Sequence, residues 1–139
     1  MKIKPYVRKV NYYETDRMCI VHHTNYIRFF EEVRIDAMSQ IGCDCLEMEK
    51  INLIIPVVDV YAKYHKSLGF SDEFAVYTKM TSFNGVKMTF EYEIRFTKDN
   101  SLSCTGKSTH CFINENGRPI SIKKSHPDIY EKMVSVLEK

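Results

Sequence analysis

The sequence predicts an α+β fold in which a curled antiparallel β-sheet wraps around one long central helix, in a single domain over residues 1–139. Two observations predict this fold. One long and unusually apolar helix comes early in the chain, and an almost unbroken series of strands follows it. Curling the sheet around the helix is the simplest way to bury both apolar surfaces in one core.

The helix is predicted from about residue 25 to residue 41, because apolar residues recur there at helical spacing. These residues are Tyr26, Phe30, Val33, Ala37 and Ile41. Four more apolar residues widen the stripe well beyond that of a surface helix, namely Ile27, Phe29, Ile35 and Met38. A helix this apolar needs cover on most sides. Gly42 is expected to cap its C-terminus.

Strands are predicted from runs of β-branched and aromatic residues and from alternation of apolar and polar residues. An extended segment is expected at residues 3–13, and four strands follow the helix at 58–65, 74–80, 86–96 and 102–113. The dipeptide Asn84-Gly85 predicts a hairpin. A short amphipathic helix is expected at 127–137, with Ser125 and Asp128 at capping-box separation. A small curled sheet leaves edge strands that need a partner, and homodimerisation would cover them.

Composition narrows the class of protein. The chain has 44% hydrophobic and 27% charged residues, as expected for a globular domain. It has no apolar run of about 20 residues that could span a membrane, and its N-terminus lacks the apolar stretch of a signal peptide. A net charge of +2 is far from that of a dedicated nucleic-acid binder. The missing signal peptide points to the cytoplasm. Five cysteines, an odd number, favour reduced thiols.

The chemistry is predicted to lie in the segment from Tyr13 to Tyr26. Asp16 stands in a turn, and the helix opens near His23. The first N–H groups of a helix have no partner within the helix, and the helix dipole adds to their attraction for negative charge. They can therefore cradle a carbonyl oxygen that becomes negative during attack, and a nearby carboxylate completes the requirements for acyl transfer. On the residues alone, a local hydrogen-bonding role for Asp16 remains the alternative.

The order of residues in this segment resembles a known signature. Tyr13-Glu-Thr-Asp16-x-Met-x-Ile-Val-His-His23-x-Asn25-Tyr26, followed by Phe30-Glu-Glu-x-Arg34, is similar to that of the 4-hydroxybenzoyl-CoA thioesterase family of hot-dog-fold proteins. The close match covers about twenty residues. The order of helix and strands extends the resemblance loosely over the whole chain.

The resemblance implies a role for four residues. Asp16 falls on the catalytic carboxylate, acting as a nucleophile or as a general base toward water. His23 falls at the helix N-terminus, where its backbone N–H would polarise the thioester carbonyl, and its side chain is implicated in catalysis in the most similar branch. Asn25 and Tyr26 match the substrate-binding part of the motif and are carried over as positioning residues. The family pattern also implies a homodimer or homotetramer with active sites at the dimer interface, and no metal or cofactor.

One residue departs from the pattern. The family usually has glycine where this chain has Cys19. If the backbone needs a positive φ there, a non-glycine residue is strained, and the reach of Asp16 depends on that turn. Cys19 is also the candidate for a nucleophilic thiol, an alternative we rank below an incidental small residue. His22 and His23 form no metal-binding spacing, because adjacent side chains are expected to diverge.

The sequence therefore predicts an acyl-CoA thioesterase that uses water to release a carboxylic acid and free CoA. Two alternatives stay open. One is a thioesterase acting on acyl groups carried by acyl-carrier protein, and the other is a non-catalytic acyl-CoA-binding protein. The acyl group itself is open among aromatic, short aliphatic and long aliphatic chains. Either Glu31 or Glu32 has the position to face an acyl pocket, although a solvated role is the simpler expectation.

Overall fold

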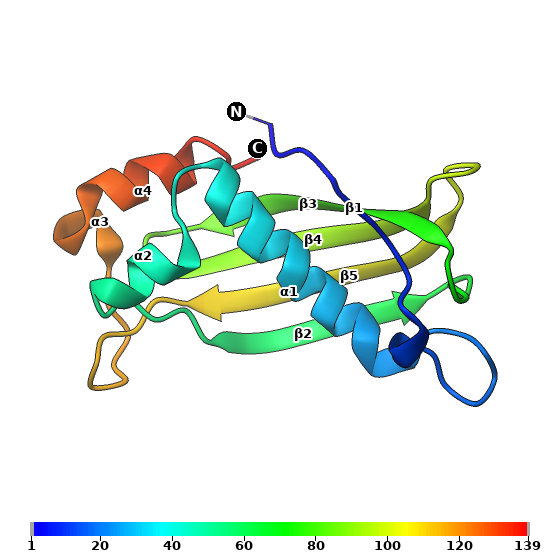
Figure 1. The fold of residues 1–139 in the computed structure, drawn as a ribbon. Coiled ribbons are helices and arrows are strands. Elements are labelled where there is room, and N and C mark those ends of the chain that lie inside the picture. Colours follow the sequence, from blue (N-terminus) through cyan, green and yellow to red (C-terminus); the bar gives the residue numbers. More distant parts are fainter. Residues whose placement is uncertain (1, 139) are drawn as a thin grey trace.

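The computed structural model describes residues 2–138 and places one long helix across a face of a five-stranded antiparallel sheet (Figure 1). The strands lie in the order β1-β3-β4-β5-β2. In chain order the elements are β1 (Tyr6–Lys9), the 3-10 helix η1 (Tyr12–Glu14), α1 (His23–Gln40), α2 (Cys45–Lys50), β2 (Val57–Tyr64), β3 (Glu73–Phe83), β4 (Lys87–Phe96), β5 (Leu102–Cys111), α3 (Ile122–Ser125) and α4 (Pro127–Val134).

Helix α1 is the long helix that the apolar spacing predicts. All five residues of the predicted stripe are buried, and Phe29 beside them is fully buried. Gly42 ends the helix with φ +80°, and the Cys43 N–H donates to the Met38 carbonyl at 2.8 Å. This pair of features is the capping arrangement predicted from Gly42. Two residues of the widened stripe are exposed to solvent: Ile27 is 40% exposed and Ile35 is 48% exposed.

The four predicted strands after the helix are present, with shifts of a few residues at their ends. The prediction of an extended segment at 3–13 is correct only for β1, because residues 12–14 form η1 instead. A local contact explains the difference, since the Glu14 carboxylate accepts the Asn11 N–H at 2.8 Å and closes the chain into a turn. Helices α2 and α3 were not predicted. Helix α4 begins after His126 without a side-chain cap, so the predicted capping box is wrong.

Strand β2 forms one edge of the sheet and is unusually exposed for its composition. Only Ala62 of its eight residues is even partly buried. Its five large apolar side chains are between 39% and 61% exposed, namely Val57, Val58, Val60, Tyr61 and Tyr64. An apolar edge strand with free backbone groups is a template for pairing with another strand. Ile27 and Ile35 of α1 add to the exposed apolar surface.

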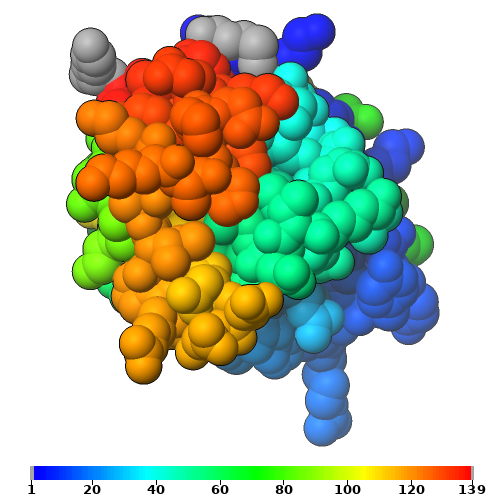
Figure 2. All heavy atoms as spheres, turned by 90° about the vertical axis from the view of Figure 1, so that its left-hand side faces the viewer, coloured from blue at the N-terminus to red at the C-terminus, as the bar shows by residue number. Residues whose placement is uncertain are grey.

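Helices α2, α3 and α4 cover the end of the sheet that lies away from the start of α1. Figure 2 shows α2 with its flanking loops (cyan to green) next to the C-terminal helices (orange to red). The Lys132 ammonium of α4 donates to the Gly42 carbonyl at 3.2 Å and so joins the two regions. Within residues 2–138, no helix combines the length and the apolarity needed to cross a bilayer.

Candidate active site

Asp16 lies in a tight loop stabilised by three hydrogen bonds. Its carboxylate accepts the Met18 N–H at 2.8 Å, its carbonyl accepts the Cys19 N–H at 3.0 Å, and its N–H donates to the Ile20 carbonyl at 2.8 Å. Cys19 has φ +64°, so the backbone here does need the left-handed conformation that glycine adopts freely. The cost is about 1–2 kcal/mol for an L-residue. The turn nevertheless forms, and Cys19 is exposed and does not line the cavity beside Asp16.

Buried polar contacts fix this loop to the start of α1. Glu14 is 6% exposed and pairs with Arg8 of β1, whose guanidinium also binds Glu32 of α1 at 2.8 Å. Asn25 is buried and donates its amide N–H to the Glu14 carbonyl at 2.8 Å. Asn25 therefore holds the chain two residues before Asp16, which is a positioning role. Of the two glutamates considered for an acyl pocket, Glu32 forms an ion pair with Arg8.

The N-terminus of α1 presents a free donor. His22 caps the helix, because its Nδ1 accepts the Thr24 N–H at 3.3 Å and its carbonyl accepts the Asn25 N–H at 2.9 Å. Among residues 2–138, the His23 N–H has no acceptor. The rings of His22 and His23 stack with centroids 4.3 Å apart, so the expectation that they diverge is wrong. No group of three metal-ligating side chains occurs in the described part of the chain.

Asp16 and His23 line one cavity of about 270 Å³. Tyr26 and Tyr64 line it too, and the Tyr64 hydroxyl donates to the His23 carbonyl at 3.0 Å. Tyr26 is 3% exposed and accepts the Leu68 N–H at 3.2 Å, and burial raises the pKa of its phenol. Three of the four predicted site residues therefore line this cavity, while Asn25 does not. A carboxylate beside a free helix N–H can activate water and stabilise an oxyanion.

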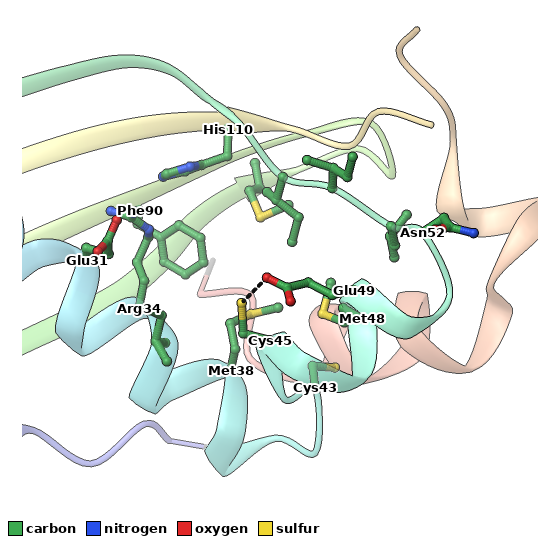
Figure 3. A pocket seen from close by; sticks show the side chains of 15 residues that line it. Glu31, Arg34, Met38, Cys43, Cys45, Met48, Glu49, Asn52, Phe90 and His110 are labelled. Atoms are coloured by element: carbon green, nitrogen blue, oxygen red, sulfur yellow. Dashed lines mark hydrogen bonds between the residues drawn. The ribbon is translucent and has the colours of Figure 1, made fainter. Parts of the chain in front are cut away.

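A larger cavity of about 550 Å³ lies beyond the middle of α1 (Figure 3). Its walls are mostly apolar, with Met38, Met48, Leu53, Ile55 and Phe90 among the residues that line it. At one end of the cavity, Glu31 and Arg34 of α1 lie opposite His110 of β5 (Figure 3). Glu31 lines this cavity but is exposed, which agrees with the solvated role that was the simpler expectation for the two glutamates.

A hydrogen-bonded chain of four side chains leads to this polar end. Arg34 donates to the Tyr92 hydroxyl at 3.2 Å, Tyr92 and Ser108 share a hydrogen bond of 2.5 Å, and Ser108 Oγ lies 2.7 Å from His110 Nε2. His110 is 2% exposed, and burial, followed by the charge of Arg34, lowers its pKa to about 4. The sequence analysis named none of these as site residues. The available signal was that Ser108 and His110 occupy consecutive positions on one face of a predicted strand.

Comparisons with known proteins place the chain in a family. Residues 10–133 match the model of the thioesterase-like superfamily. The chain belongs to the thioesterase-like superfamily. This membership confirms the hot-dog fold and the enzyme class predicted from the sequence, a thioester hydrolase. It confirms the resemblance at the level of the superfamily and leaves open which family within it applies.

Individual relatives agree with this superfamily. The Bacillus subtilis protein YneP, named provisionally as an acyl-CoA thioesterase, is 35% identical over 128 residues, which are 89% of this chain and 92% of that protein. A DHNA-CoA thioesterase from Staphylococcus aureus has a TM-score of 0.92 at 30% identity, covering 98% of this chain and 91% of that one. A hypothetical protein from Aquifex aeolicus has a TM-score of 0.83 at 30% identity, covering 91% and 98%.

Proposed function

We propose that this protein is an acyl-CoA thioesterase in which Asp16 is the catalytic carboxylate. The observation that carries the proposal is that Asp16 and His23 line the same cavity, and that the His23 N–H has no acceptor among residues 2–138. Asp16 attacks the thioester carbonyl or deprotonates the attacking water, and the His23 N–H stabilises the oxyanion. Membership of the superfamily supports the reaction, and the names of the relatives support CoA as the carrier.

The catalytic unit is proposed to be a homodimer formed through β2. Within one chain the two cavities are far apart, because Arg34 lies roughly 16 Å along the helix axis from His23 at 1.5 Å per residue. The Tyr64 end of β2 contacts His23, whereas its Val57 end pairs with His110. Antiparallel pairing of two β2 strands about a two-fold axis sets the Tyr64 end of one copy beside the Val57 end of the other.

This pairing would place the Asp16 cavity of each copy against the larger cavity of its partner. The thioester then lies at the helix N-terminus of one subunit, and its acyl group extends into the cavity of the second. The exposed side chains of Ile27 and Ile35 are covered by the same arrangement. A dimer in sedimentation velocity supports it, and a monomer at assay concentration contradicts it.

The cytoplasm remains the predicted compartment, and all five cysteines are free thiols.

The test is thiol release from acyl-CoAs, from acetyl to palmitoyl and including benzoyl and phenylacetyl. Asp16→Asn should lose activity by a factor of roughly 10²–10⁴, the usual contribution of a general base. Asparagine keeps a side-chain oxygen for the Met18 N–H, so the loop should still form. Asp99→Asn is a matched control, because the Asp99 carboxylate accepts the Ser101 N–H at 3.0 Å in an exposed turn of the same kind, and Asp99 does not line the cavity.

Each outcome has a distinct meaning. Full activity of Asp16→Asn would refute the role of this carboxylate. Turnover of an acyl-carrier-protein thioester, with no turnover of the CoA thioester of the same acyl group, would show that the carrier is acyl-carrier protein and not CoA. Binding of acyl-CoA without turnover by the folded wild-type dimer would favour the non-catalytic alternative.

A further inference from the structure

The hydrogen-bonded chain that ends at His110 has only one arrangement of protons that satisfies every buried group. Arg34 has no acceptor atom, so the Tyr92 oxygen must accept from it. Tyr92 is 2% exposed and its only other partner within residues 2–138 is Ser108, so its proton goes to Ser108 Oγ. Ser108 then donates its own proton to His110 Nε2. The opposite direction would leave the buried Tyr92 hydroxyl proton without an acceptor, at a cost that folded proteins avoid.

The direction of this chain decides which proton His110 presents. With Nε2 acting as acceptor, a neutral imidazole carries its proton on Nδ1. Burial and the Arg34 charge keep the ring neutral, since they lower the pKa of His110 to about 4. Nδ1 has no partner among residues 2–138, and it is not sealed from solvent. Because His110 lines the larger cavity, its Nδ1–H is a donor that opens on that cavity.

Arg34 adds further donors at the same end. Its guanidinium lines the cavity, binds Tyr92 through one nitrogen, and has no carboxylate within 4.0 Å in the described residues. A partly buried guanidinium without an ion pair has unused donors that favour an oxygen ligand. Figure 3 shows Arg34 and His110 facing each other across the polar end. The rest of the cavity offers apolar side chains such as Met48 and Phe90.

We propose that the larger cavity selects acyl groups that carry a hydrogen-bond-accepting oxygen remote from the thioester, and that His110 donates the selecting hydrogen bond. The inference rests on the proposed function, because it takes the acyl group to be the ligand of this cavity. A volume of about 550 Å³ lies within the usual range for small-molecule pockets. A plain alkyl or aryl group would fill the apolar part and displace water from the donors of His110 and Arg34 without pairing them.

The experiment compares acyl-CoAs that differ in one substituent. The aromatic series is phenylacetyl-, 4-hydroxyphenylacetyl- and 4-aminophenylacetyl-CoA, and the aliphatic pair is octanoyl- and 8-hydroxyoctanoyl-CoA. In at least one series, wild type should show kcat/KM at least tenfold higher for the oxygen-bearing group than for the plain one, because a site with buried donors rejects a ligand that cannot pair them. The amino compound, a poor acceptor, should behave like the plain one.

Variants test whether the hydrogen-bonded chain causes the preference. His110→Phe should reduce the ratio of the two kcat/KM values toward one. Ser108→Ala should also reduce it, because His110 Nε2 loses its donor and Nδ1 is no longer held protonated. His126→Phe is a matched control at the start of α4, and it should keep the wild-type ratio. Thermal unfolding by circular dichroism verifies that each variant is folded, and Ser108→Ala carries the test if His110→Phe does not fold.

The outcomes separate this inference from the proposed function. Hydrolysis of all acyl-CoAs with a ratio near one in wild type would overturn the selection by oxygen and leave the thioesterase assignment intact. A strong preference that persists in both His110→Phe and Ser108→Ala would overturn the role of His110. Absence of hydrolysis of every thioester would overturn the proposed function and this inference together, because the cavity would then have no acyl group to select.

Discussion

Adding a single methyl group at Gly106 should be among the most damaging small changes in this protein. Gly106 lies in β5 opposite Tyr92 of β4, directly beneath the Phe30 ring of α1. A Cβ atom there would lie 2.3 Å from two ring carbons of Phe30 and 2.9 Å from the Tyr61 carbonyl oxygen. Ordinary contact between carbon atoms is about 3.5–4.0 Å, so the ring would have to move by more than about 1 Å.

The surroundings leave little room for that movement. Phe30 is fully buried and stacks on Tyr92 with centroids 4.4 Å apart. The second contact is with the backbone of β2, which cannot yield without separating β2 from β5. Overpacking a core costs about 1–3 kcal/mol, and we expect Gly106→Ala to reach or exceed the upper value. That loss corresponds to roughly 10 °C in Tm for a chain of this size.

The assay is urea unfolding at one fixed protein concentration, since dimerisation would make stability depend on concentration. Gly69→Ala is the matched control, because a Cβ there meets ordinary contacts at 3.5 Å and 3.7 Å. That control should stay within about 0.5 kcal/mol of wild type. Combining Gly106→Ala with Phe30→Leu should recover at least about 1 kcal/mol of the loss through coupling of the two sites. Wild-type stability for Gly106→Ala, or no coupling with Phe30, would refute the reasoning.

Two further predictions follow from the turn and from the buried histidine. Cys19→Gly should stabilise the protein by about 0.5–1 kcal/mol, because it removes the strain at φ +64°. Part of that gain is offset, since glycine loses more conformational entropy on folding than cysteine does. Urea unfolding beside Cys19→Ala, which removes the thiol and keeps the strain, measures this effect, and equal stability of the two variants would contradict it. The second prediction concerns pH: His110 has a folded pKa of about 4, below the ordinary value of 6.5. The unfolded chain therefore binds more protons between these values, and stability should be fully present above pH 6.5 and fall by about 2 kcal/mol by pH 5. This part of the pH dependence, measured by urea unfolding, should be absent from His110→Phe, and an identical pH profile in that variant would show that another group causes the fall.

Local patterns were sufficient to predict most of the secondary structure. The helical spacing of Tyr26, Phe30 and Val33 identified both the helix and the side that faces the core. These features are readable because periodicity and turn chemistry act between residues close in sequence. The resemblance raised the question of a positive φ at Cys19, and the backbone has one. A tight loop is set by its own few residues, so a residue pattern can point to such a position. The 3-10 turn at Glu14 was missed although the contact that closes it, from the Asn11 N–H to the Glu14 carboxylate, is local.

The sequence by itself determined the α+β fold class, the apolar character of α1 and the placing of Asp16 in a turn before a helix. Only the tertiary structure decided which distant side chains meet. Arg34, Tyr92 and Ser108 come from three different elements, and their protons are ordered by contacts between α1, β4 and β5. A sequence pattern records which face a residue occupies but not which partner lies opposite. The hydrogen bonds that orient His110 therefore exist only once the helix has packed against the sheet.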